Sequence, residues 1–123
     1  MAFLTDRKRA AGLGSAKAGT EHHWSMTKSS VGLLILTPLF LLVIGPMLGR
    51  PHAEVVEYFS RPFPAIVTGL MLVVGFLHFK GGVQTLIEDY VHGFARKVLI
   101  VAMICLSYAA MATGLYAVVK LAL

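Results

Sequence analysis

The sequence has 123 residues, of which 57% are hydrophobic and only 14% are charged. This composition excludes a disordered segment, a nucleic-acid-binding arm and a disulfide scaffold. A membrane-spanning helix uses roughly 20 apolar residues, and the chain has about 70, enough for three such helices. We therefore predict an all-α integral membrane protein with three transmembrane helices and no independent soluble domain.

The net charge of +5 is interpreted first as an orientation signal, because Lys and Arg are concentrated on the cytoplasmic side of membrane proteins. Cys105 is the only cysteine, so the chain has no internal disulfide. Its position in an apolar run predicts a small buried side chain.

Residues 1–28 form a basic segment, and they lack the short basic region and cleavage site of a secretory signal. We expect this segment to be retained. The uncharged run 29–49 is the first predicted transmembrane helix. Pro38 and Pro46 are expected to bend it, because each removes a backbone N–H donor.

Two further apolar runs complete the predicted topology. The second transmembrane helix is expected at 62–87, where Lys80 is the only charged residue, and the third at 98–119. The remaining segments are the loops 50–61 and 88–97 and the tail 120–123.

The distribution of Lys and Arg predicts the orientation. Seven of them fall in 1–28 and 88–97, whereas three fall in 50–61 and 120–123. The N-terminus and the loop 88–97 are therefore expected to be cytoplasmic, and the loop 50–61 and the C-terminus periplasmic. Lys80 can then direct its ammonium toward the cytoplasmic interface.

His78 lies well inside the second predicted span, where a charged side chain is costly, so we expect it to be neutral. A neutral imidazole can form a hydrogen bond with an adjacent helix or bind a metal, and its position alone leaves both open. Nearby glycines at 75, 81 and 82 share roughly one helix face with it. They leave room for a flat group such as a porphyrin, or they allow close helix packing.

The other histidines fall outside the predicted spans and are expected to be solvated or at headgroup level; they are His22, His23, His52 and His92. His22 and His23 precede Trp24, which is typical of an interfacial belt. One intramembrane histidine cannot supply both axial ligands of a low-spin haem. A haem would therefore need its second ligand from another subunit.

Glu88, Asp89 and Tyr90 follow at the cytoplasmic end of the second predicted span. A phenol there can donate a hydrogen bond to a quinone carbonyl, and an adjacent carboxylate can orient it. The alternative is an interfacial tyrosine beside a solvated helix end.

The stretch HFKGGVQTLIEDY, from His78 to Tyr90, resembles the signature of the hydrophobic membrane anchor subunit of succinate dehydrogenase, of the alphaproteobacterial type. In that family, Asp and Tyr follow a haem-ligating histidine by eleven and twelve residues, and Asp89 and Tyr90 have this spacing. The segment GLGSAKAGTEHHW, residues 12–24, is also similar to the segment before the first helix of such anchors.

The resemblance implies that His78 is an axial ligand to haem b, that Tyr90 hydrogen-bonds ubiquinone and that Asp89 supports the quinone site. Related anchors often have a basic, arginine-containing sequence after the HW motif, whereas this chain reads SMTK from Ser25 to Lys28, so we assign Lys28 no quinone role. The three helices would pack with a second anchor, the cytochrome b556 subunit, around haem b. Implied partners are that subunit, an iron–sulfur subunit, a flavoprotein subunit and membrane lipid, without nucleic acid.

The chain is thus expected to be no enzyme on its own but a subunit of succinate:ubiquinone oxidoreductase in the bacterial inner membrane, where it serves the respiratory chain and the tricarboxylic acid cycle. One alternative is a non-catalytic three-helix scaffold or assembly protein. Another, a small pore or transporter, would need a polar stripe on more than one helix. The scattered polar residues of 98–119 are more simply interhelical hydrogen-bonding groups; they are Ser107, Tyr108, Thr113 and Tyr116.

Overall fold

The computed structural model describes residues 4–12 and 20–123, and every regular element in this part of the chain is a helix. Residues 13–19 of the N-terminal motif, with Lys17, lie outside the described residues. The elements are α1 (Asp6–Ala11), α2 (Glu21–Ile44), the 3-10 helix η1 (Gly45–Met47), α3 (His52–Phe59), α4 (Pro62–Tyr90) and α5 (Gly93–Ala122).

Three stretches are long and apolar enough to cross a membrane: Glu21–Met47, Pro62–Tyr90 and Gly93–Ala122. In a bilayer, a chain without internal backbone hydrogen bonds would leave its N–H and C=O groups unpaired, so long apolar runs form helices. The prediction of an all-α chain with three candidate spans is confirmed.

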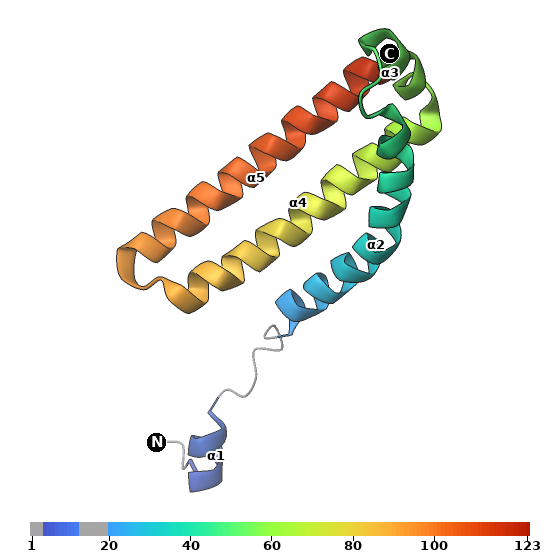
Figure 1. The fold of residues 1–123 in the computed structure, drawn as a ribbon. Helices are drawn as coiled ribbons and strands as arrows, with labels where there is room; N and C mark the ends of the chain where they lie inside the picture. The colour runs from blue at the N-terminus through green and yellow to red at the C-terminus, as the bar shows by residue number, and fades with distance from the viewer. Residues whose placement is uncertain (1–3, 13–19) are drawn as a thin grey trace.

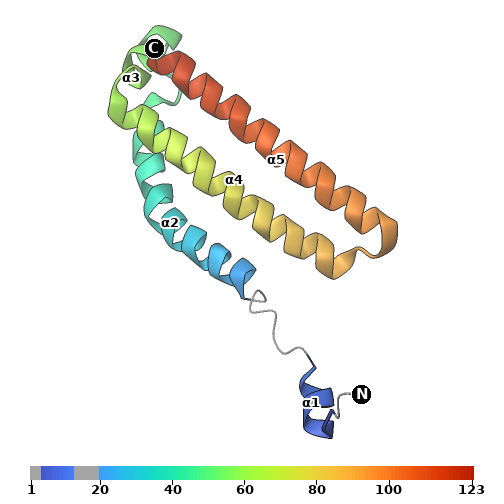
Figure 2. The ribbon, with the colours of Figure 1, turned by 180° about the vertical axis from the view of Figure 1, so that it is seen from behind.

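The three long helices form an open layer with α4 in the middle. Helices α2 and α5 each pack along α4 rather than along one another. Figures 1 and 2 show α4 between them from opposite sides, with α3 near the C-terminus. One end of the layer therefore combines the start of α2, the end of α4 and the start of α5.

The chain buries little of its apolar surface. Within the most apolar window of each candidate span, 6%, 17% and 11% of the residues are buried, in chain order. The buried hydrophobic residues are Val43, Phe59, Ala65, Val67, Ile87 and Met103. Apolar surface of this extent is stable in hydrocarbon or against another protein, and not in water.

Helix α2 begins at Glu21, eight residues before the expected span 29–49, so His22 and His23 lie in its first turn. Pro38 lies inside the helix, and Figure 1 shows α2 curving along its length. Pro46 does not bend a continuing helix, and that expectation is wrong. It lies in η1, where the helix ends, because its ring cannot donate the next backbone hydrogen bond.

Helix α3 lies within 50–61, where only a loop was expected. Its N-cap is Pro51, and charged pairs one turn apart flank it, Arg50 with Glu54 at 3.7 Å and Glu57 with Arg61 at 3.6 Å. Its Phe59 is buried. Two sequence signals indicate this helix. Apolar residues lie one turn before Phe59, and opposite charges stand at i,i+4.

The turn between α4 and α5 is much shorter than the expected loop 88–97. Helix α4 continues to Tyr90 and α5 starts at Gly93. Gly93 has φ +70°, a conformation that glycine adopts without steric cost. The two helices are therefore joined as a tight antiparallel pair.

Cys105 is exposed, so the expectation of a buried cysteine is wrong. Helix α5 buries Met103 and Ser107, which lie one turn apart on one stripe. Cys105 is two residues from each and therefore points away from that stripe. An open layer buries only one side of an edge helix.

Candidate functional site

His78 is half-buried in α4 and contacts α2. Its Nδ1 lies 2.9 Å from the hydroxyl oxygen of Ser29, which is also half-buried. This is the hydrogen bond to an adjacent helix that the sequence left open. Among the hydrogen bonds of the described residues, the His78 Nε2 atom has none.

The Ser29 hydroxyl is hydrogen-bonded within its own helix as well. Its oxygen lies 2.9 Å from the carbonyl oxygen of Met26 and 3.1 Å from that of Ser25. Ser30 makes a similar bond to Met26 at 2.9 Å, and its side chain has no other hydrogen bond within the part of the chain that the structure describes. The two neighbouring serines thus differ in their contact with His78.

The glycines near His78 divide between the two uses that the sequence allowed. Gly81 is buried, and a Cβ there would collide with the sulfur of Met26 and lie 3.6 Å from the His22 ring. Gly81 therefore serves close packing of α4 on α2. A Cβ at Gly75 would meet no atom within 4 Å.

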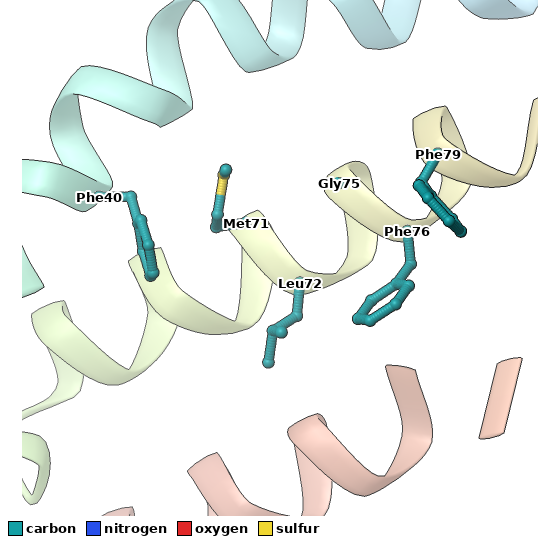
Figure 3. A pocket seen from close by; sticks show the side chains of 6 residues that line it. All are labelled: Phe40, Met71, Leu72, Gly75, Phe76 and Phe79. Carbon is teal, nitrogen blue, oxygen red and sulfur yellow. The ribbon is translucent and has the colours of Figure 1, made fainter. Parts of the chain in front are cut away.

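Gly75 borders an apolar hollow of about 350 Å³ on the surface of the chain. Figure 3 shows the residues that line it, which are Phe40, Met71, Leu72, Gly75, Phe76 and Phe79. At Gly75, one turn before His78, the backbone of α4 is open to a flat apolar group.

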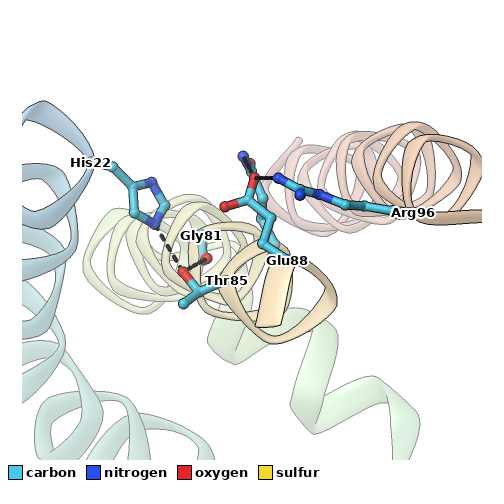
Figure 4. Close-up of polar contacts among 6 residues, drawn as sticks. His22, Gly81, Thr85, Glu88 and Arg96 are labelled. Carbon is cyan, nitrogen blue, oxygen red and sulfur yellow. Dashed lines mark hydrogen bonds and ion pairs between the residues drawn. The ribbon is translucent and has the colours of Figure 1, made fainter. Parts of the chain in front are cut away.

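His22 forms a second polar bond between α2 and α4. Its Nε2 lies 3.1 Å from the hydroxyl oxygen of Thr85, and that hydroxyl donates to the Gly81 carbonyl at 3.2 Å (Figure 4). The sequence had suggested only a headgroup-level side chain for His22. It is exposed, as expected, but it also joins the helices, a contact that no local pattern indicates.

The end of α4 carries the residues expected at a quinone site. Tyr90 is 80% exposed and Asp89 is exposed, and no side-chain hydrogen bond or ion pair is recorded for either within 4–12 and 20–123. Glu88, by contrast, has two polar partners. Its carboxylate accepts a hydrogen bond from the Gln84 amide at 3.0 Å and lies 3.9 Å from the Arg96 guanidinium, a pair that Figure 4 shows. The Tyr90 hydroxyl is thus exposed and has no hydrogen-bond partner among the described residues.

His78 and Tyr90 lie twelve residues apart on the same continuous helix. At about 1.5 Å per residue, this separates them by about 18 Å along the axis. The structure thus places the two on one rigid element but does not bring them into contact.

Lys80 contacts α5. Its ammonium donates to the Tyr108 hydroxyl at 3.0 Å and lies 5.1 Å from the centroid of that ring. Of the four polar α5 residues expected to bond between helices, Tyr108 does so. The expectation is wrong for Ser107 and Thr113, whose hydroxyls bond within α5, to the Met103 sulfur and the Ala109 carbonyl.

Within the described residues, no three His, Cys, Asp or Glu side chains gather as a metal site.

Comparison with known proteins gives the family. A model of the succinate dehydrogenase/fumarate reductase transmembrane subunit matches residues 2–119. The chain belongs to this family. The succinate dehydrogenase hydrophobic membrane anchor subunit of Paracoccus denitrificans is 43% identical over 123 residues, covering 100% of this chain and 95% of the relative.

The hydrophobic membrane anchor subunit of Rickettsia bellii (strain RML369-C) is 30% identical over 104 residues, which cover 81% of each chain. No solved structure gives a significant match. The resemblance to alphaproteobacterial membrane anchor subunits is thus confirmed, and the chain is a membrane-anchor subunit of succinate dehydrogenase, an oxidoreductase.

Proposed function

We propose that this anchor subunit supplies one axial ligand, His78, to haem b and one hydrogen-bond donor, Tyr90, to the ubiquinone-reduction site of the complex. Asp89 supports that site from the adjacent position. The second axial histidine comes from the cytochrome b556 anchor, and electrons arrive from the flavoprotein through the iron–sulfur subunit.

The observation that carries this proposal is the environment of the His78 ring. Its Nδ1 is bonded to Ser29, while Nε2 has no hydrogen bond among the described residues. Iron binds the ring nitrogen that keeps its lone pair. The other ring nitrogen of such a histidine is held by a hydrogen bond to a neighbouring group. Gly75, one turn away, leaves the backbone open to a flat group. The residues present therefore fit a haem.

When bound, the haem supplies reversible one-electron chemistry. The chain's own residues do the rest: His78 fixes the position of the iron, and the apolar side chains of α4 exclude water. At the end of the same helix, the exposed Tyr90 hydroxyl can donate to a carbonyl oxygen of the quinone.

The distribution of basic residues supports an orientation with the N-terminus in the cytoplasm. Seven Lys and Arg lie on the side of 1–28 and 88–97, against three on the other. In a bacterial inner membrane, Tyr90 then lies at the cytoplasmic surface, which an iron–sulfur subunit can reach from solution.

The haem ligand is tested with His78→Leu in the assembled complex, by the reduced-minus-oxidised spectrum and the haem content. We expect loss of the haem b signal, because leucine has no ligating atom. His23→Leu is the matched control, since His23 lies on the exposed first turn of α2. An unchanged spectrum in the His78 variant would reject the ligand role and favour the scaffold alternative.

The quinone donor is tested with Tyr90→Phe. Loss of the hydroxyl should lower ubiquinone reduction but not the reduction of an artificial acceptor that takes electrons upstream. Tyr116→Phe removes a phenol from an exposed position on α5 and should change neither rate. Equal losses of both rates in the Tyr90 variant would indicate damaged assembly rather than a lost donor.

A further inference from the structure

We infer that Ser29 is a positioning residue for the haem ligand: it holds His78 in the tautomer that carries its proton on Nδ1 and leaves the Nε2 lone pair for iron. This inference rests on the proposed ligand role of His78. It assigns to α2, and not only to α4, a part in the electronic properties of the haem.

The Ser29 oxygen has more hydrogen-bond neighbours than its one proton can serve. Three atoms lie within hydrogen-bond distance of it: the carbonyl oxygens of Met26 and Ser25 and the Nδ1 of His78. A hydroxyl has one proton, and a carbonyl oxygen can only accept. If Ser29 donates to a carbonyl, it must accept its remaining bond from an N–H on His78.

The opposite arrangement is unfavourable. If Ser29 donated its proton to Nδ1, its oxygen would face two carbonyl oxygens at 2.9 and 3.1 Å with no hydrogen between them. Oxygen lone pairs at such distances repel, and the low dielectric of the membrane does little to screen them. The Nδ1–H tautomer places a hydrogen in the Ser29–His78 contact and leaves the Ser29 proton for the carbonyl side, and its Nε2 carries the lone pair.

The hydrogen bond between Ser29 and His78 also changes how strongly the imidazole donates electrons to iron. An Nδ1–H that donates to an oxygen makes the imidazole a stronger electron donor at Nε2, as partners in the outer shell of metal sites generally do. The Ser29 hydroxyl donates in turn to a helix carbonyl, so the two bonds polarise each other. Stronger donation stabilises oxidised iron more than reduced iron. Ser29 therefore lowers the haem midpoint potential.

The test is Ser29→Ala in the assembled four-subunit complex, with haem content and a redox titration of the haem b spectrum as readouts. We expect a higher midpoint potential and a haem affinity weaker by about ten- to a hundredfold, the usual effect of losing such a partner. Ser30→Ala is the matched control, because Ser30 makes the same bond to Met26 without contacting His78. Ser29→Thr keeps the hydroxyl and should restore the potential.

A Ser29→Ala potential equal to that of Ser30→Ala would overturn the inference. If the alanine complex does not assemble, Ser29→Cys replaces it: the thiol is a weak acceptor, so the potential must still rise, and an unchanged value would also overturn the inference. Failure of the proposed function is distinguishable, because His78→Leu would then leave the haem b spectrum intact. Loss of that spectrum with no effect at Ser29 rejects the positioning role alone.

Discussion

The two faces of α4 are built from different contacts. Toward α2, the hydrogen bonds involve two histidines, His22 with Thr85 and His78 with Ser29, around the close approach at Gly81. Toward α5, the polar contacts are made by charged side chains, Lys80 with Tyr108 and Glu88 with Arg96.

The two sides of α4 therefore have different roles. The α2 side positions imidazole rings through short bonds to hydroxyls, which suits a ligand whose tautomer matters. The α5 side provides a partner for the Lys80 ammonium, which would be costly to leave alone in the membrane, and a partly exposed ion pair for Glu88 at the end of α4. The haem ligand of the proposal therefore depends on α2 more than on α5.

Gly81→Ala tests the α2 side most directly. The added Cβ would overlap the Met26 sulfur, and this flexible side chain must move, so we expect the free energy of unfolding of the chain in detergent micelles to fall by about 1 kcal/mol, the low end for overpacked sites. Denaturation with sodium dodecyl sulfate measures it. Gly75→Ala, with no atom near its Cβ, is the control and should be neutral or more stable. Equal losses at both positions would contradict close packing at Gly81.

Tyr108→Phe tests the α5 side. It removes the hydroxyl that accepts from Lys80 but keeps the ring beneath the ammonium, so we expect a loss of about 1 kcal/mol in the same measurement. The effect should shrink in Lys80→Met, where no ammonium needs the hydroxyl. Full additivity of the two changes would show that the residues do not interact.

Thr85→Val removes the hydroxyl that His22 contacts while preserving the side-chain shape. Hydrogen bonds between transmembrane helices average about 0.6 kcal/mol, and we expect a loss of this order in the free energy of unfolding. Thr113→Val is matched to it, because the Thr113 hydroxyl bonds only within α5. The comparison fails if the two valine variants lose the same amount.

Arg96→Gln should have the smallest effect. The pair with Glu88 is 3.9 Å long and both side chains are more than a third exposed, so we expect a loss of under about 0.5 kcal/mol that vanishes at high salt. Lys97→Gln, with no ion pair recorded in the described part of the chain, serves as the reference. A large, salt-independent loss would place this pair in a far drier environment than its exposure indicates.

Much of the fold could be predicted, because the elements depend on local composition. Runs of apolar residues long enough to span produced three helices, whereas α3 was not expected, because eight residues with two pairs of opposite charges give a weaker signal than a long apolar run. Pro46 was expected to bend the helix but lies where the helix ends, because the missing N–H of a proline is compatible with either a kink or a helix end. The site was half predictable: His78 stood out as an intramembrane histidine, but Ser29 was one of two adjacent serines at the start of the first predicted span, and nothing in the sequence paired it with His78.

The sequence by itself determined that the chain forms membrane-spanning helices and that His78 lies inside the second, because a backbone in lipid must form its hydrogen bonds within its own run of residues. The structure decided that Tyr90, which was expected in the loop 88–97, ends the same helix. Only the tertiary structure decided which side chains meet: Ser29 on His78, His22 on Thr85, and Cys105 facing outward. The physical reason is that these helices are apolar on nearly all sides. Hydrophobic periodicity therefore leaves their contact faces unspecified, and packing selects them.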